Sequence, residues 1–314
     1  MKVANKKTQV GFALLTMYIA WGTTYVGIAL AIESMPDLLA MGMRFIAAAS
    51  IQFLLVGLRS GFSQFALTTT QLRNTTLLGT MMLAVGLGTM SAAEHVVPLS
   101  AASLIVASMP IWTGLFRMLD GDRPSRFSVI GIAAGFLGIL IILAPGQTVA
   151  RAGGNPANIT LWMFIILLGN LSWSIGSFIT TRLDTPKNPL VLTTYEMAAA
   201  GVVLTLCGLG KGQSFADFFD ATHRSWAGWI YLVIIGSVVG YSTYNFLLNN
   251  APISLVSTYS YVNPVVATAL GLVIFNEPLT HNIVIGGMVV LASVALVITS
   301  ENRSSRKAID SKTI

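Results

Sequence analysis

The segment PISLVSTYSYVNPVVATALGLVIFNEP, residues 252–278, has a counterpart in PLSAASLIVASMPIWTGLFRMLDGDRP, residues 98–124. Each segment has proline at its first, thirteenth and last positions, and the whole chain contains only 11 prolines. Because three prolines in the same register are not expected by chance in such a chain, we interpret the two segments as copies of one unit.

The similarity continues upstream. Three residue pairs keep a constant separation, which is 154 in the first pair and 152 in the other two: Gly86 and Gly240, Trp21 and Trp173, Arg44 and Glu196. The sequence therefore predicts an internal duplication with a two-residue insertion or deletion. We place the first repeat at 1–149, the second at 150–300 and a short basic cytoplasmic tail at 301–314, which we expect to be disordered.

The composition is that of a membrane protein, with 54% hydrophobic residues, 10% charged residues and a mean hydropathy of +0.75. About 20 apolar residues cross a bilayer as a helix, and the apolar runs are too long and continuous for a β-barrel. The sequence predicts an all-α membrane protein of ten transmembrane helices, which form one membrane domain. We place them at 11–31, 37–57, 74–93, 98–118, 127–144, 159–180, 190–209, 227–248, 253–275 and 281–299.

The positive charges predict the orientation. With the N-terminus inside, the outer segments hold only Arg151, Lys211 and Arg224 of the 18 Lys and Arg residues, Arg44 lies within a span, and the rest are inside. Both termini should therefore be cytoplasmic. The same bias explains the net charge of +6, so we expect no nucleic-acid partner.

Each repeat contains five spans, an odd number, so the second repeat should enter the membrane upside down relative to the first. Such inverted repeats are an architecture of secondary transporters, in which the halves rock around a central site. Alternating access is then a property of the duplication itself.

Polar and aromatic residues inside spans are the candidates for a substrate pocket. Small and hydroxyl residues also serve helix packing, so spans 1 and 6 allow either interpretation. Unpaired amides and hydroxyls are costly in hydrocarbon, so those of spans 8 and 9 should face the bundle interior. Pro110 and Pro264 should kink or break spans 4 and 9 or serve packing alone. The candidate substrate-binding residues are Trp21, Thr24, Tyr25, Arg44, Trp112, Trp173, Ser177, Tyr244, Asn245, Tyr259, Tyr261 and Asn263.

Arg44 and Glu196 are the formal charges well inside spans, where a charge is costly and often functional. They are equivalent in the two repeats, but inversion should separate them by about 12 Å along the membrane normal. We expect no ion pair, with each serving its own side as a gate or a substrate or proton site, or snorkelling from a helix end. Glu94 and His95 end span 3 at the outer face, as a pH-sensing or binding pair or as a solvated helix end. The candidate coupling or gating residues are Glu196, Glu94, Pro110 and Pro264.

Two further segments are predicted to be tight turns with a following helix cap, 276–280 and 122–125. Phosphate-binding loops, metal-protease motifs and Cys/His clusters are absent from the sequence. We therefore expect neither a cofactor nor a metal, and no enzymatic activity.

The sequence resembles the EamA-type carriers of the drug/metabolite transporter superfamily across residues 8–300. The resemblance is carried by Trp21-Gly-Thr-Thr-Tyr25, Arg44-Phe45, Glu94-His95, Val106 to Pro110, Ser172-Trp173-Ser174, Glu196-Met197, Ser260 to Val266 and Asn276 to Thr280. Two of these stretches, Glu94-His95 and Ser260 to Val266, are most similar to the YedA branch of inner-membrane permeases. The resemblance implies a metabolite exporter of the bacterial inner membrane with a central cavity built by spans 1, 3, 4, 6, 8 and 9.

From these observations we expect a secondary active exporter of small metabolites, amino acids or related compounds. Arg44 is a partner for a substrate carboxylate and Glu196 a proton-coupling group. An uncoupled facilitator or a multidrug exporter of the same fold remains an alternative, and a membrane enzyme acting on lipid-linked substrates is a remote one. The expected partners are a small-molecule substrate and membrane lipid, and the chain should be a monomer or a weak dimer.

Overall fold

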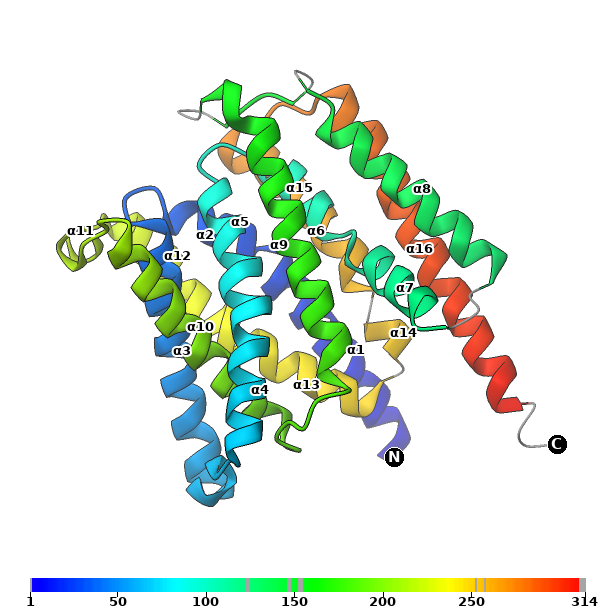
Figure 1. The fold of residues 1–314 in the computed structure, drawn as a ribbon, viewed down its shortest axis with the longest axis horizontal. Helices are drawn as coiled ribbons and strands as arrows, with labels where there is room; N and C mark the ends of the chain where they lie inside the picture. Colours follow the sequence, from blue (N-terminus) through cyan, green and yellow to red (C-terminus); the bar gives the residue numbers. More distant parts are fainter. Residues whose placement is uncertain are drawn as a thin grey trace.

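The computed structural model describes residues 2–121, 125–145, 148–151, 155–251, 253–256 and 258–310. The described chain is a helical bundle, in which the start of α1 and the end of α16 lie toward the same, lower end (Figure 1). Among the described residues, nine helices have the length and composition to cross a membrane, and Tyr259–Phe275 is a shorter apolar helix. The chain is thus a multi-pass, all-α membrane protein, as predicted.

The elements of the first half are α1 Lys2–Gly22, α2 Thr24–Ala31, α3 Asp37–Ser60, η1 Phe62–Phe65, α4 Thr69–Gly79, η2 Thr80–Leu87, α5 Gly88–Ala93, α6 Leu99–Val106, α7 Met109–Leu119 and α8 Arg126–Leu143. Those of the second half are η3 Pro156–Asn158, α9 Ile159–Thr180, α10 Pro189–Gly210, α11 Phe215–Phe219, α12 His223–Tyr231, η4 Leu232–Val239, α13 Gly240–Asn250, α14 Ile253–Val256, α15 Tyr259–Phe275 and α16 His281–Asp310.

The element boundaries repeat with the offsets found in the sequence. α3 and α10 begin 152 residues apart, and α6 and α14 begin 154 apart. η2 and η4 begin and end 152 apart, and both are π-helical. Since π-helical turns are rare and often mark functional sites, their occurrence at equivalent positions of both halves is strong support for the duplication.

Contacts between the halves follow the same symmetry. α3 packs along α10 and α8 along α16, which are pairs of equivalent helices. At the level of whole spans, the contact of span 1 with span 8, made by α2 and α12, has its counterpart in that of span 6 with span 3, made by α9 and η2. At the crossing of α3 and α10, a Cβ on Gly42 would lie 3.0 Å from the carbonyl oxygen of Gly201, and the converse distance is the same. The absent side chains therefore let the two backbones touch.

The helix breaks lie slightly upstream of the prolines predicted to cause them. Pro110 stands in the first turn of α7, after an interruption between α6 and α7, and Pro264 lies inside α15. In span 9 the helix is interrupted between α14 and α15 instead. A proline needs no N–H partner in the first turn of a helix, so Pro110 starts a helix rather than breaking one.

The structure confirms the predicted turn at 276–280 but not the predicted disorder of the tail. Asn276 adopts the left-handed conformation (φ 51°), and Thr280 accepts from the Ile283 amide at 3.4 Å, which confirms the turn and cap there. Ser125 caps α8, while residues 122–124 lie outside the described part. The tail was expected to be disordered, but α16 continues to Asp310, because extending an existing helix is far easier than starting one.

Candidate functional site

A cavity of about 110 Å³ lies between the two halves. Its walls come from spans 1, 3, 4, 6, 8 and 9, and Arg44 adds span 2. The lining residues are Trp21, Thr24, Tyr25, Ile28, Arg44, Gly86, Leu87, Met90, Ser103, Val106, Ala107, Met109, Asn170, Trp173, Gly236, Tyr241, Tyr259, Ser260, Asn263 and Pro264. Both π-helical segments contribute, since Gly86 and Leu87 belong to η2 and Gly236 to η4.

An aromatic cluster forms one side of this central cavity. The indole of Trp21, at the end of α1, lies 5.1 Å from the ring of Tyr259, 5.2 Å from Tyr244 and 5.7 Å from Tyr241, measured between centroids. One residue of the first half thus contacts three tyrosines of the second half. Aromatic pairs in these geometries are rigid and amphipathic, which suits a wall for organic substrates.

Arg44 is buried, with 2% of its surface exposed, and has no acidic partner within ion-pair distance among the described residues. Its Nε donates to the Ser237 hydroxyl at 3.1 Å, and its guanidinium lies 5.0 Å from the Phe45 ring. A buried cation without a carboxylate partner is costly, so an anionic group in the cavity would stabilise it. Among the described residues, no ion pair joins Arg44 to Glu196.

Polar residues at equivalent positions of spans 1 and 6 hold the two broken helices. Asn170 Nδ2 donates to the Ile105 carbonyl at 3.2 Å and to the Ser108 hydroxyl at 2.9 Å, at the interruption before α7. Tyr18, 152 residues earlier, forms a hydrogen bond with Thr258 at the interruption before α15. Each half thus places a hydrogen-bonding side chain against the helix break of the other half.

The structure places eight of the predicted residues at the central cavity: Trp21, Thr24, Tyr25, Arg44, Trp173, Tyr259, Asn263 and Pro264. The Oδ1 atom of Asn263 is buried without a hydrogen-bond partner among the described residues. Since a buried amide oxygen ordinarily has a donor, Asn263 is free to accept one from a bound molecule.

The other predicted residues lie away from the cavity lining. Trp112 packs edge-on against Phe136 at 4.8 Å, Tyr244 packs against Trp21, and Tyr261 packs against the apolar cluster of α6, α8 and α16. Three more predicted residues have other positions: Ser177 is half-buried in α9, Pro110 begins α7, and the side chain of Asn245 lies outside the described part.

Glu196 is buried in α10 with 6% of its surface exposed, and it does not line the central cavity. Its backbone lies against Gly79, where an added Cβ would be 2.3 Å from the Glu196 carbonyl oxygen. Tyr241, which does line the cavity, lies near both Glu196 and Arg44.

Sequence reasoning missed four polar lining residues: Ser103, Asn170, Tyr241 and Ser260. Asn170 could have been found, because the repeat offset pairs it with Tyr18 and an amide in mid-span requires partners. Among the described residues, no group of three His, Cys, Asp or Glu side chains could hold a metal ion. The cavity therefore offers aromatic faces, amides, hydroxyls and one cation.

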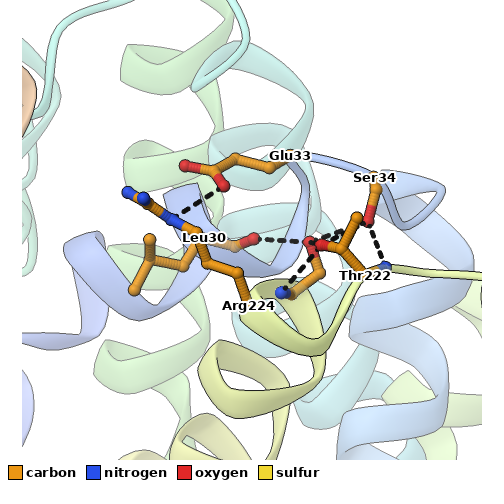
Figure 2. Close-up of polar contacts among 6 residues, drawn as sticks. Leu30, Glu33, Ser34, Thr222 and Arg224 are labelled. Carbon is orange, nitrogen blue, oxygen red and sulfur yellow. Dashed lines mark hydrogen bonds and ion pairs between the residues drawn. The ribbon is translucent and has the colours of Figure 1, made fainter.

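Polar contacts join the two halves between α2 and α12 (Figure 2). Arg224 Nε lies 3.0 Å from Glu33 Oε2, and the Thr222 amide donates to the Ser34 hydroxyl at 2.9 Å. The Ser225 hydroxyl donates to the Leu30 carbonyl at 2.8 Å. We call this set the α2–α12 latch. By the predicted orientation it lies at the outer face.

A second cavity, of about 460 Å³, lies beside the latch and is lined by Ala29, Ile32, Glu33, Glu94, His95, Arg151 and Phe275. We call it the vestibule. Arg151 Nη1 donates to the backbone carbonyl of Glu94 at 3.2 Å, and its guanidinium lies 4.2 Å from the Phe275 ring centroid. Burial raises the pKa of the Glu94 carboxyl well above its usual range, and the nearby Arg151 opposes this shift.

Comparisons with known proteins agree with this architecture. The model of the EamA-like transporter family matches residues 9–144 and 160–299. The "Uncharacterized inner membrane transporter YedA" of Escherichia coli (strain K12) is 34% identical over 269 residues, which are 85% of this chain and 83% of that protein. The "Probable amino-acid metabolite efflux pump" of Salmonella typhimurium is 23% identical over 90% of this chain and 92% of its own length. A crystal structure with 18% identity, covering 94% of this chain and 98% of its own, has a TM-score of 0.61, which shows a shared fold.

Proposed function

This chain belongs to the EamA-like transporter family, and we propose that it is a secondary exporter of small metabolites, amino acids or related compounds. Transport through the membrane, rather than chemical conversion, is the activity of the family. The observation that carries the proposal is Arg44, a buried cation at the wall of the central cavity without an acidic partner among the described residues. A relative described as a probable amino-acid metabolite efflux pump supports the substrate class.

The central cavity suggests how such a substrate binds. A carboxylate would receive charge-assisted hydrogen bonds from Arg44. The free Oδ1 of Asn263 would accept from an amino or hydroxyl group, and the rings around Trp21 would contact the apolar part. Because each contact comes from a different span, movement of the halves would make and break the site.

Alternating access follows from the inverted halves. In the structure the α2–α12 latch joins the halves at the predicted outer face, which supports a state closed toward the outside. The repeat-equivalent elements would form the corresponding closure at the inner face in the other state. The pairs α3–α10 and α8–α16, which pack along each other, would serve as the surfaces about which the halves move.

A second possibility is an uncoupled facilitator or a multidrug exporter. It is favoured by Met90 and Met109 in the lining, because flexible methionines adapt to varied ligands. The coupled exporter needs a proton-binding group, for which Glu196 is a candidate by its burial. If Glu196 couples transport to protons, replacing it with Gln should abolish gradient-driven transport and leave exchange intact.

We place the protein in the bacterial inner membrane with both termini in the cytoplasm. The relative from Escherichia coli is described as an inner membrane transporter. Because one chain supplies both halves of the central cavity, a monomer is sufficient for transport, and we propose a monomer or a weak dimer.

The test is a metabolite profile of the medium from cells that express the protein, with and without a protonophore. We expect amino acids to accumulate outside only while the proton gradient is intact. The variant Arg44→Ala should abolish accumulation. Arg59→Ala is the matched control, because Arg59 is an exposed arginine of the same helix. Accumulation that persists with the protonophore would favour the facilitator, and equal accumulation by Arg44→Ala and wild type would overturn the assignment of the site.

A further inference from the structure

Glu94 is a buried carboxyl group that the proposed substrate site does not use. It follows directly after α5, with its backbone amide donating to the Met90 carbonyl at 3.0 Å. Its side chain is 0% exposed, and neither carboxylate oxygen has a hydrogen-bond partner in the part of the chain that the structure describes. An ionised carboxylate in such a place would lose its hydration without compensation.

The contrast with Glu277 shows that this is not the general condition of buried carboxyls in the protein. Glu277 is also buried, with 4% of its surface exposed, but it accepts from the Leu99 and Ser100 amides. These amides favour the ionised form of Glu277, against the effect of its burial. The carboxyl of Glu94 has no such donor among the described residues, so its surroundings favour the neutral acid, in which one oxygen carries a proton.

A cation and a route to water are nevertheless close to Glu94. The residue lines the vestibule together with Glu33, His95 and Arg151. Arg151 donates to the backbone carbonyl of Glu94 rather than to its carboxylate. A change of the Glu94 rotamer toward the vestibule would bring the carboxylate to this guanidinium, where the ionised form is stabilised.

The charge on Glu94 also acts on the central cavity. Among the groups that interact with it electrostatically are Arg44 and Tyr25, which line that cavity. The titratable and charged groups around Glu94 are Tyr25 on α2, Arg44 on α3, Arg151 between the halves, Glu277 before α16, and Glu33 and His95 at the vestibule, with Asp37 3.9 Å from His95. A change in the protonation of Glu94 therefore changes the electrostatic potential at Arg44, the cation proposed to bind the substrate.

We propose that Glu94 is a proton-binding site of this transporter, protonated in the state described here and exchanging its proton with the outer solution through the vestibule. The step is a simple transfer, in which a proton passes between water in the vestibule and one carboxylate oxygen. The inference deepens the proposed function by assigning the outer proton site to Glu94, alongside the candidate role of Glu196.

Infrared spectroscopy of the full-length protein in lipid vesicles tests this without a substrate. A protonated carboxyl group gives a carbonyl band distinct from that of a carboxylate. We expect a band that persists at neutral pH and loses amplitude in Glu94→Gln. Glu277→Gln is the matched control, a buried glutamate with amide donors, and should retain most of the band. Equal band amplitudes for Glu94→Gln and wild type would overturn the proposal.

A second variant keeps the proposal testable if Glu94→Gln does not fold. Arg151→Gln removes the cation that stabilises the ionised form of Glu94, so the pH at which the band disappears should rise. Arg151→Lys keeps the charge and should titrate close to wild type. An unchanged titration in Arg151→Gln would contradict the proposed route. Because these readouts need no transport, they are independent of the metabolite assay, whose failure would concern the proposed function instead.

Discussion

The carboxylate of Glu277 accepts a hydrogen bond from the backbone amide of Leu99 at 2.9 Å, so the turn after span 9 caps the first residue of α6 in the other half. Its second oxygen accepts from the amide of Ser100 at 3.4 Å. Burial raises the pKa of the Glu277 carboxyl, while these amides and Arg151 act in the opposite direction. A negative charge at a helix N-terminus also interacts favourably with the helix dipole.

Replacing Glu277 with alanine should destabilise the protein by about 1–3 kcal/mol, because two buried amides of α6 lose their acceptor. Thermal unfolding in detergent would measure the loss. Glu277→Gln keeps one acceptor oxygen and should lie between alanine and wild type. An alanine variant that unfolds at the wild-type temperature would show that the Glu277 carboxylate does not stabilise α6.

Gly271 provides an independent check of the contact between Glu277 and α6. An added Cβ would lie 2.6 Å from Glu277 Oε2, so Gly271→Ala should displace the carboxylate from α6. If both changes act by removing the hydrogen bonds between Glu277 and α6, the double variant should be hardly less stable than either single variant.

The duplication could be predicted from the sequence because prolines, glycines and charges keep their register. The offset of 152 residues that pairs Arg44 with Glu196 also relates the boundaries of η2 and η4. The π-helical geometry itself could not be foreseen, since it depends on packing against the other half. The position of the break in span 9 was not foreseen either, because Pro264 is accommodated within α15.

The cavity was predictable where a side chain is large or charged and lies in mid-span, as for Trp21 and Arg44. It was less so for Ser103 and Tyr241, whose types are ordinary in membrane helices. Trp112 shows the limit of the reasoning. It follows a proline in a broken span, which favoured a place in the cavity, yet its ring packs against Phe136. The prediction failed because periodicity alone does not tell which face of α7 points inward.

The α2–α12 latch predicts a change in conformational equilibrium rather than in stability. Exposed ion pairs contribute about 0–1 kcal/mol, and Arg224 is 59% exposed, so Arg224→Ala should unfold at nearly the wild-type temperature. It should, however, favour the outward-open state. With Ile28→Cys as a reporter in the central cavity, and Cys207 replaced by serine, labelling by an impermeant thiol reagent from outside should increase several-fold.

The chain offers a matched control at the other face. Arg182 forms an ion pair with Asp120, both of them substantially exposed, at the predicted inner face. Arg182→Ala removes a comparable pair and should not increase labelling from outside. Equal labelling of both variants and of the parent reporter protein would show that the α2–α12 latch does not hold the outer side closed.

Removing the hydrogen bonds at the two helix breaks should lower the stability of the protein by different amounts. Asn170→Leu removes two buried hydrogen bonds at the break before α7 and should cost about 1–3 kcal/mol. Tyr18→Phe removes one partly buried bond to Thr258 and should cost less, about 1 kcal/mol. Thermal unfolding would rank the variants. A Tyr18→Phe variant less stable than Asn170→Leu would contradict the assigned order.

Glu94 predicts a pH dependence of stability with a definite sign. Its pKa in the folded protein is raised by burial, against the opposing effect of Arg151, so the folded state retains the proton over a range in which the unfolded chain has lost it. An unperturbed glutamate has a pKa of about 4.3. Below this pH, Glu94 is protonated in both the folded and the unfolded state, so its titration does not reduce the stability of the folded protein. As the pH rises above this value, ionisation favours the unfolded chain, and wild type loses stability until the folded-state pKa is passed.

Glu94→Gln has no proton to lose and should escape this loss. We therefore expect its melting temperature to match wild type in acid and to exceed it increasingly toward neutral pH. Glu277→Gln should not match wild type in acid, because it removes an acceptor of the Leu99 and Ser100 amides at every pH. A constant difference between Glu94→Gln and wild type at every pH would mean that the variant alters packing rather than a proton equilibrium.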